Sequence, residues 1–96
     1  MPAYLIVRAN VTDMQQYQEY MKLTPGILEK YGGRFVVRGG EKVILEGPDA
    51  PERIVVVKFD SVDAARRMYD SAEYQAAKKL REGAADASFI VMEGLE

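Results

Sequence analysis

The sequence predicts an α+β fold in which an antiparallel sheet carries its helices on one face. Two observations lead to this prediction. Strand and helix signals follow one another along the 96 residues in the order strand, helix, strand or hairpin, strand, helix, strand. In addition, a glycine pair stands on each side of the β-forming run in residues 31–40 (YGGRFVVRGG). A helix must therefore end before this run, and the chain must reverse after it.

Several short segments have the composition and alternation of β-strands. They are residues 4–11, 34–38, 42–46, 53–59 and 88–93. The run 53–59 is the most apolar of them and is expected in the centre of the sheet. Gly39 and Gly40 predict a tight turn or a bulge. Residues 47–51 contain two prolines and a glycine and are expected to form a loop.

The first helix is expected to follow residues 4–11 directly. Thr12 and Asp13 are both good N-cap residues, and each is followed three positions later by a glutamine. Pro25 interrupts the apolar stripe, so we expect a kinked or two-piece helix that runs to about Lys30. Gly32, in a left-handed conformation, would end it.

Two capping signals predict the later helices. Ser61 is expected to cap a second helix, and the sequence DSAE at 70–73 is a further capping box, which predicts another helix running to Gly83. Ser71 is therefore expected to be a cap and not a nucleophile, since the chain has no histidine to activate it. The basic cluster at residues 78–81 is expected to form a solvated helix face.

Two strand–helix–strand units in tandem predict the ferredoxin-like βαββαβ plait, as a single domain over residues 1–96. Its first and third strands lie in the centre, and its helices cover one face. The opposite face carries many apolar side chains. They are Tyr4, Ile6, Val36, Ile54, Val56, Ile90 and Met92. Because no spare segment can cover this surface, we expect a homodimer in which two sheets pack face to face.

Basic residues interrupt this apolar face. By strand alternation Arg8, Arg38 and Lys58 belong to it, and charges in such a place need partners or a ligand. Two interpretations stay open. The three residues form a binding pocket for a small anionic ligand, or they lie at the sheet rim and pair with Glu46 or Glu93 across the dimer.

The composition excludes several classes of site. The absence of cysteine and histidine removes disulfides, thiol nucleophiles, thiolate zinc sites and imidazole bases. Asp60, Asp63 and Asp70 are too far apart along a helix to converge on a metal, so no metal site is expected. The net charge of −2 gives no reason to bind nucleic acid or an anionic membrane. Without a membrane span or a signal-peptide pattern, a cytoplasmic protein is expected.

Two motifs resemble a known family: residues 31–40, and residues 70–81 (DSAEYQAAKKLR). Glu46-Gly47 and residues 84–87 are also similar. The chain resembles the family called domain of unknown function 1330, within the dimeric α/β-barrel superfamily. This resemblance implies a ferredoxin-like fold, a side-by-side dimer and a cavity between sheet and helices, but no reaction. Superfamily relatives include small monooxygenases, muconolactone-isomerase-like proteins and haem-binding enzymes.

Three residues are candidates for chemistry. Tyr69 and Tyr74 flank Ser71, and a phenol can donate or accept a proton, although such tyrosines commonly only pack their rings. Glu46 is the best acid–base candidate, but neighbouring arginines would lower its pKa and favour ion pairing. Tyr17 could roof a cavity over the sheet.

These features lead to one main expectation about function. We expect a small dimeric enzyme that acts on a small organic acid or aromatic anion and, like the cofactor-free relatives, needs no cofactor. The alternatives are a non-catalytic ligand-binding module and a purely structural dimer.

Overall fold

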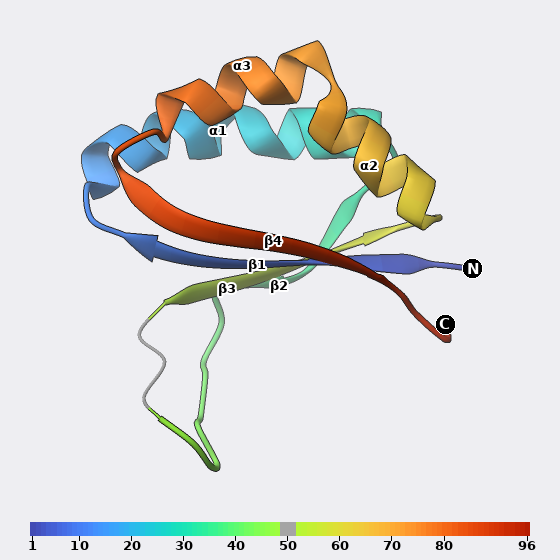
Figure 1. The fold of residues 1–96 in the computed structure, drawn as a ribbon, viewed down its shortest axis with the longest axis horizontal. Coiled ribbons are helices and arrows are strands. Elements are labelled where there is room, and N and C mark those ends of the chain that lie inside the picture. Colours follow the sequence, from blue (N-terminus) through green and yellow to red (C-terminus); the bar gives the residue numbers. More distant parts are fainter. Residues whose placement is uncertain (49–51) are drawn as a thin grey trace.

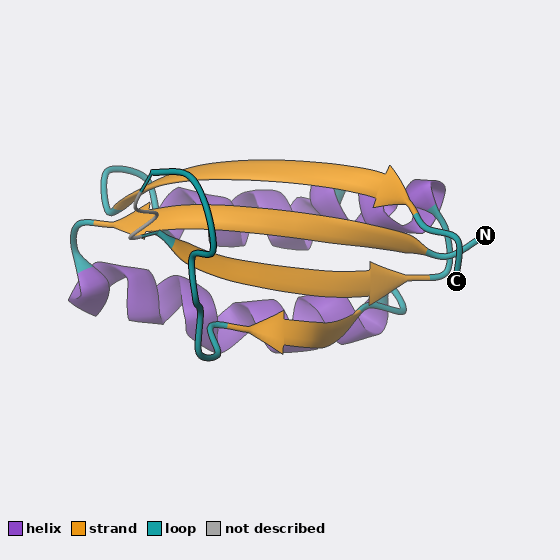
Figure 2. Ribbon diagram, turned by 90° about the horizontal axis from the view of Figure 1, so that it is seen from below, coloured by secondary structure: helices purple, strands orange, loops and turns teal. Residues whose placement is uncertain are grey.

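The structure, a computed structural model, describes residues 1–48 and 52–96 (Figure 1). In chain order the elements are β1 (Ala3–Val11), α1 (Met14–Lys30), β2 (Arg34–Arg38), β3 (Arg53–Phe59), α2 (Val62–Asp70), α3 (Ala72–Leu80) and β4 (Ala85–Glu93). The strands form one antiparallel sheet in the order β2-β3-β1-β4. The helices lie together on one face of it (Figures 1 and 2). This arrangement confirms the predicted ferredoxin-like fold. Of the expected loop 47–51, residues 49–51 lie outside the described part of the chain.

Helix α1 is one continuous element, so the two-piece alternative is wrong. Of the two predicted caps, Asp13 is the one that begins it: its carboxylate accepts a hydrogen bond from the Gln16 amide at 3.1 Å. Pro25 has no N–H to give to the Met21 carbonyl. The Thr24 hydroxyl donates to that carbonyl instead, at 3.5 Å. The helix ends before Gly32, whose φ of 82° is the left-handed conformation expected there.

A bulge in β2 changes which of its side chains face the helices. The register shifts between Phe35 and Val37, so Arg38 lies opposite Val55 and shares the helix-facing side with Phe35. Val37 lies opposite Val56 on the open face. The expected alternation is therefore wrong for Val37 and Arg38, because one extra residue in a strand inverts the faces of all that follow.

The segment expected as a strand at 42–46 forms none. Gly39, with a φ of 66°, ends β2 and donates its amide to the Ile54 carbonyl at 3.1 Å. From there the chain leaves the sheet as a loop that hangs below the face opposite to the helices (Figure 1). Val43 and Leu45 are 70% and 93% exposed in it. An alternating pattern does not make a strand where no partner strand lies alongside.

The last helix and strand are shifted from their expected bounds. Helix α3 ends at Leu80 rather than at Gly83, and a turn occupies residues 81–84. Strand β4 starts at Ala85 rather than at residue 88, because β1 reaches Val11 and offers it a partner there.

The core lies between the sheet and the helices. Its largest fully buried side chains are Val57, Phe59, Met68 and Tyr74. The helices leave the other sheet face free, and the loop after β2 passes in front of one end of it (Figure 2). On it Ile90 and Met92 are 51% and 57% exposed. No helix in the described residues is both long and apolar enough to cross a membrane.

Candidate functional site

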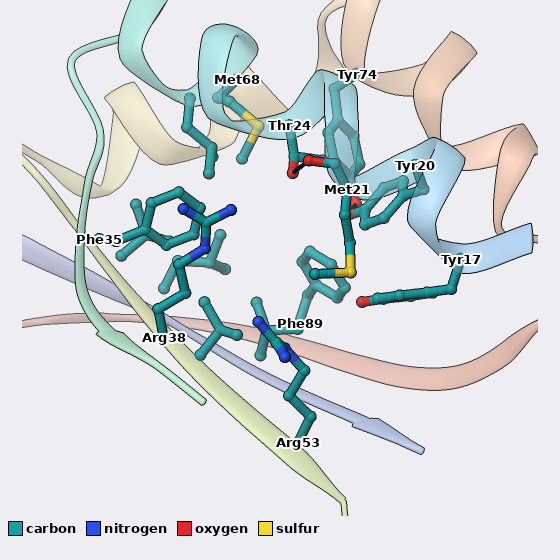
Figure 3. Close-up of a pocket in the computed structure, with 15 residues that line it drawn as sticks. Tyr17, Tyr20, Met21, Thr24, Phe35, Arg38, Arg53, Met68, Tyr74 and Phe89 are labelled. Carbon is teal, nitrogen blue, oxygen red and sulfur yellow. Dashed lines mark hydrogen bonds between the residues drawn. The ribbon is translucent and has the colours of Figure 1, made fainter. Parts of the chain in front are cut away.

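A small cavity lies between α1 and the helix-facing side of the sheet, with a free volume of about 50 Å³. Its walls are mainly apolar and aromatic, and two arginines from neighbouring strands contribute to them. The residues labelled in Figure 3 are Tyr17, Tyr20, Met21, Thr24, Phe35, Arg38, Arg53, Met68, Tyr74 and Phe89. All four strands and all three helices contribute residues to its walls. The contribution of α3 is Tyr74, and that of β4 is Phe89. The cavity therefore depends on the whole packing of helices on the sheet.

Arg38 reaches this cavity because of the bulge in β2. Its guanidinium lies 4.3 Å from the centre of the Phe35 ring, a cation–π contact that orients the side chain along the strand. Within residues 1–48 and 52–96 it has no carboxylate partner. The charge is therefore available to a ligand in the cavity.

Arg53 is the second basic residue of the cavity, and the sequence analysis did not single it out. Along β3 it shares its face with Val55 and Val57, so the alternation of that strand could have placed it there. Gly39 gives it room, because a Cβ at that position would lie 3.1 Å from the guanidinium carbon. In the described parts of the chain Arg53 also lacks a carboxylate partner.

Tyr17 completes the polar side of the cavity. Figure 3 shows its hydroxyl pointing into the same space as the guanidinium groups of Arg38 and Arg53. Burial raises the pKa of Tyr17 above 10.0, and the charges of Arg81 and Arg53 oppose this increase. The phenol stays protonated at neutral pH and can donate a hydrogen bond. It is a poor proton acceptor.

A buried polar cluster stands behind the aromatic wall. The Tyr20 and Tyr74 hydroxyls lie 2.8 Å apart, and Arg81 donates to the Tyr74 oxygen at 3.4 Å. The Arg81 guanidinium also lies 5.4 Å from the Tyr20 ring centre and 5.0 Å from that of Phe89. Arg81 is only 8% exposed, so its expected place on a solvated helix face is wrong. It follows the last turn of α3 and turns inward under the helices.

The sequence-predicted ligand residues are divided between the two sheet faces. Arg38 lines the cavity, whereas Arg8 and Lys58 lie on the open face, opposite Ile54 and Tyr4. Arg8 donates to the Glu52 carboxylate from its Nε at 3.0 Å. This contact holds the pKa of Glu52 below its usual value. The structure therefore does not bring the three basic residues into one pocket.

The candidates for chemistry are also separated. Tyr74 lines the cavity, and Tyr69 lies on the far side of the Tyr74 ring, with ring centres 5.1 Å apart. Glu46 is exposed in the loop after β2. Ser71 is a cap, as expected: its hydroxyl accepts from the Tyr74 amide at 3.1 Å and donates to the Met68 carbonyl at 2.7 Å. In the described residues no carboxylates gather in a way that could hold a metal ion.

Solved structures of the same fold were found among proteins of low sequence identity. A protein of unknown function from Rhodopseudomonas palustris superposes with a TM-score of 0.80 and 23% identity, covering 99% of this chain and 83% of that one. A dimeric ferredoxin-like protein of unknown function from Jannaschia sp. CCS1 has a TM-score of 0.71 and 13% identity, covering 98% of this chain and 100% of that one. At these identities the likeness shows the fold alone.

An enzyme is among the similar structures. SnoaB, a cofactor-independent oxygenase from Streptomyces nogalater, has a TM-score of 0.69 and 11% identity, covering 99% of this chain and 94% of that one. A search among curated proteins found no significant match. The family model for DUF1330, a domain of unknown function, matches residues 2–95. The chain therefore belongs to the DUF1330 family.

Proposed function

We propose that the protein binds a small organic anion in the cavity between α1 and the sheet. The observation that carries this proposal is the pair Arg38 and Arg53. Two guanidinium groups from adjacent strands point into one cavity, and no carboxylate of the described residues neutralises either of them. Arginine is well suited to hold a carboxylate, because its planar group can donate two parallel hydrogen bonds.

The size of the cavity limits the ligand. Its free volume of about 50 Å³ holds about three to five water-sized groups, because a water needs roughly 10–15 Å³ by this measure. A short-chain carboxylate fits this volume. An aromatic acid requires the long side chains at the rim, Met21 and the two arginines, to move outward.

The polar groups of the cavity favour binding over acid–base catalysis. Arg38, Arg53 and Tyr17 all present hydrogen-bond donors, and the raised pKa of Tyr17 keeps its proton in place. Such an arrangement stabilises negative charge on a ligand but does not remove a proton from it. A binding role therefore fits this cavity better than a mechanism with a tyrosine or Glu46 as general base.

A titration at neutral pH, followed by amide NMR, tests this function, with sodium butyrate as the probe and butylamine, a cation at this pH, as the control. We expect butyrate to shift the amides of Tyr17, Arg38 and Arg53. Replacing Arg53 with Gln should weaken binding roughly tenfold, the effect of losing one charge-assisted hydrogen bond. The matched control is Arg67→Gln, which removes an exposed arginine of α2 that does not line the cavity. Equal affinities for butyrate in the two variants would contradict the proposal.

The homodimer is the second part of the proposed function. The chain exposes 6353 Å², whereas a compact monomer of 10.8 kDa exposes about 5,500 Å². The surface of this chain is therefore roughly 800 Å² larger than that of a compact monomer. Much of the apolar part is the open sheet face and the loop beside it, including Val43, Leu45 and Ile90. A second copy placed on this face would cover it, and the similar Jannaschia protein is described as dimeric.

A further inference from the structure

A second hollow also lies between the helices and the sheet, at the β4 edge, where α2, α3 and β4 surround it. It is an open groove of about 510 Å³, within the usual range for small-molecule sites. Its apolar side is formed by Leu5, Ala65, Ala87, Phe89 and Val91. Leu5 and Phe89 also border the cavity under α1, so they stand between the two hollows.

The remaining walls of the groove are mostly basic. Arg66 and Lys78 line it from α2 and α3, Arg81 lines it from the end of α3, and Asp70 is the acidic residue among its lining groups. None of these groups forms an ion pair with another described residue. Lys78 donates instead to the Tyr69 hydroxyl at 2.7 Å. The groove therefore carries an excess of positive charge.

Arg81 gives the strongest indication that an anion belongs here. More than nine-tenths of this residue is buried, and its Nε has no hydrogen-bond partner among the described residues. Two aromatic rings and the Tyr74 hydroxyl contact its guanidinium, but no carboxylate does. Burying a cation is unfavourable unless an opposite charge compensates it, and cation–π contacts offset only part of this cost. A ligand anion in the groove would supply the missing charge.

We propose that this groove is a second binding site, specific for a carboxylate that carries an apolar chain or ring. The carboxylate lies among Lys78, Arg66 and Arg81. The apolar body lies along Phe89 and Val91 of β4. This site does not rest on the proposed function of the cavity, because the two share only apolar wall residues.

A titration with sodium octanoate, followed by amide NMR, tests the proposal. We expect shifts at the amides of Lys78, Arg81 and Phe89. Lys78→Gln should weaken octanoate binding roughly tenfold, as expected for one charge-assisted contact. Lys79→Gln is the matched control, because it removes the same charge from the next position of α3, which is exposed and does not line the groove. It should change the affinity less than twofold.

Three results would overturn the proposal. The first is an equal loss of octanoate affinity in the Lys78 and Lys79 variants. The second is that octylamine at neutral pH shifts the same amides as much as octanoate does. The third is that octanoate shifts only amides of the cavity or of the open sheet face. Arg53→Gln separates the two sites: it should weaken butyrate binding in the cavity and leave the octanoate shifts at Phe89 and Lys78 unchanged. A failure of one site therefore does not count against the other.

Discussion

The hydroxyl of Tyr20 on α1 lies 2.8 Å from the hydroxyl of Tyr74 on α3, and both side chains are buried. Their rings meet nearly edge to face, with centres 6.2 Å apart. Since Arg81 donates to the same Tyr74 oxygen, one phenol serves two buried partners. This cluster joins the two helices behind the cavity. Because its polar atoms are buried, they depend on one another for hydrogen bonds.

Removing the Tyr74 hydroxyl should cost more stability than removing that of Tyr20. Tyr74→Phe leaves both the Tyr20 hydroxyl and an Arg81 N–H without their partner, whereas Tyr20→Phe leaves the Arg81 contact intact. We expect a loss of about 2–3 kcal/mol for the first and about 1 kcal/mol for the second. Urea unfolding of the two variants and of the double variant measures this. Two results would show that Tyr74 does not link the cluster. One is an equal loss of unfolding free energy in the two single variants, and the other is a loss in the double variant that equals the sum of the single losses.

Alkaline pH should destabilise the protein through Tyr20. Burial, followed by the neighbouring Tyr74, raises the pKa of Tyr20 well above its ordinary 10.0. Above about pH 10 the unfolded chain loses this proton and the folded chain keeps it, so the free energy of unfolding falls as pH rises. The slope is up to about 1.4 kcal/mol per pH unit for one such group. Urea unfolding at several alkaline pH values should show that the free energy of unfolding falls less steeply with pH for Tyr20→Phe than for the wild type. Equal slopes in the two proteins would contradict the role of Tyr20.

The glycine pairs should differ in their tolerance of a side chain. A Cβ at Gly33 would lie 2.7 Å from the Phe59 ring and 3.1 Å from the Leu28 carbonyl, and Phe59 is 1% exposed. We expect Gly33→Ala to cost about 1–3 kcal/mol through overpacking. Gly40→Ala is the control, because nothing lies within 4 Å of its Cβ position. It should change the free energy of unfolding by less than about 0.5 kcal/mol. If Gly33→Ala left the free energy of unfolding unchanged, the end of α1 would not pack tightly on β3.

A charge in the open sheet face should separate the proposed dimer. Ile90 is half exposed on that face, opposite Ile6 of β1. Ile90→Asp would place a carboxylate in an apolar interface, where burying an unpaired charge is strongly unfavourable. Sedimentation equilibrium should show a dimer for the wild type and a monomer for this variant. Leu23→Asp, at a 49% exposed position of α1 on the opposite side of the sheet, should remain dimeric. A monomeric wild type would exclude the dimer.

Much of the fold could be predicted from local signals in the sequence. Ser61 and Ser71 cap the helices that they were expected to cap, and Asp13 is one of the two caps predicted for α1, because a cap depends on only a few neighbouring residues. The apolar open face follows equally from strand alternation, since Ile6, Val56 and Ile90 lie side by side on it.

The candidate site could be predicted only in part. The sequence analysis placed Arg38 on the wrong face of the sheet, because the bulge depends on the pairing of β2 with β3 and leaves no clear local signal. Its role in binding a ligand stays a prediction. The alternation of β3 could have placed Arg53 in the cavity. The burial of Arg81 could not be foreseen, since the residue lies past the end of α3 and its direction depends on how the aromatic rings pack.

The most direct test of the central claim is a crystal structure of the protein grown with sodium butyrate. We expect electron density for a carboxylate within hydrogen-bond distance of Arg38 and Arg53, with its short chain toward Phe89 inside the cavity. A cavity that stays empty at saturating butyrate, or a butyrate bound away from both arginines, would contradict it.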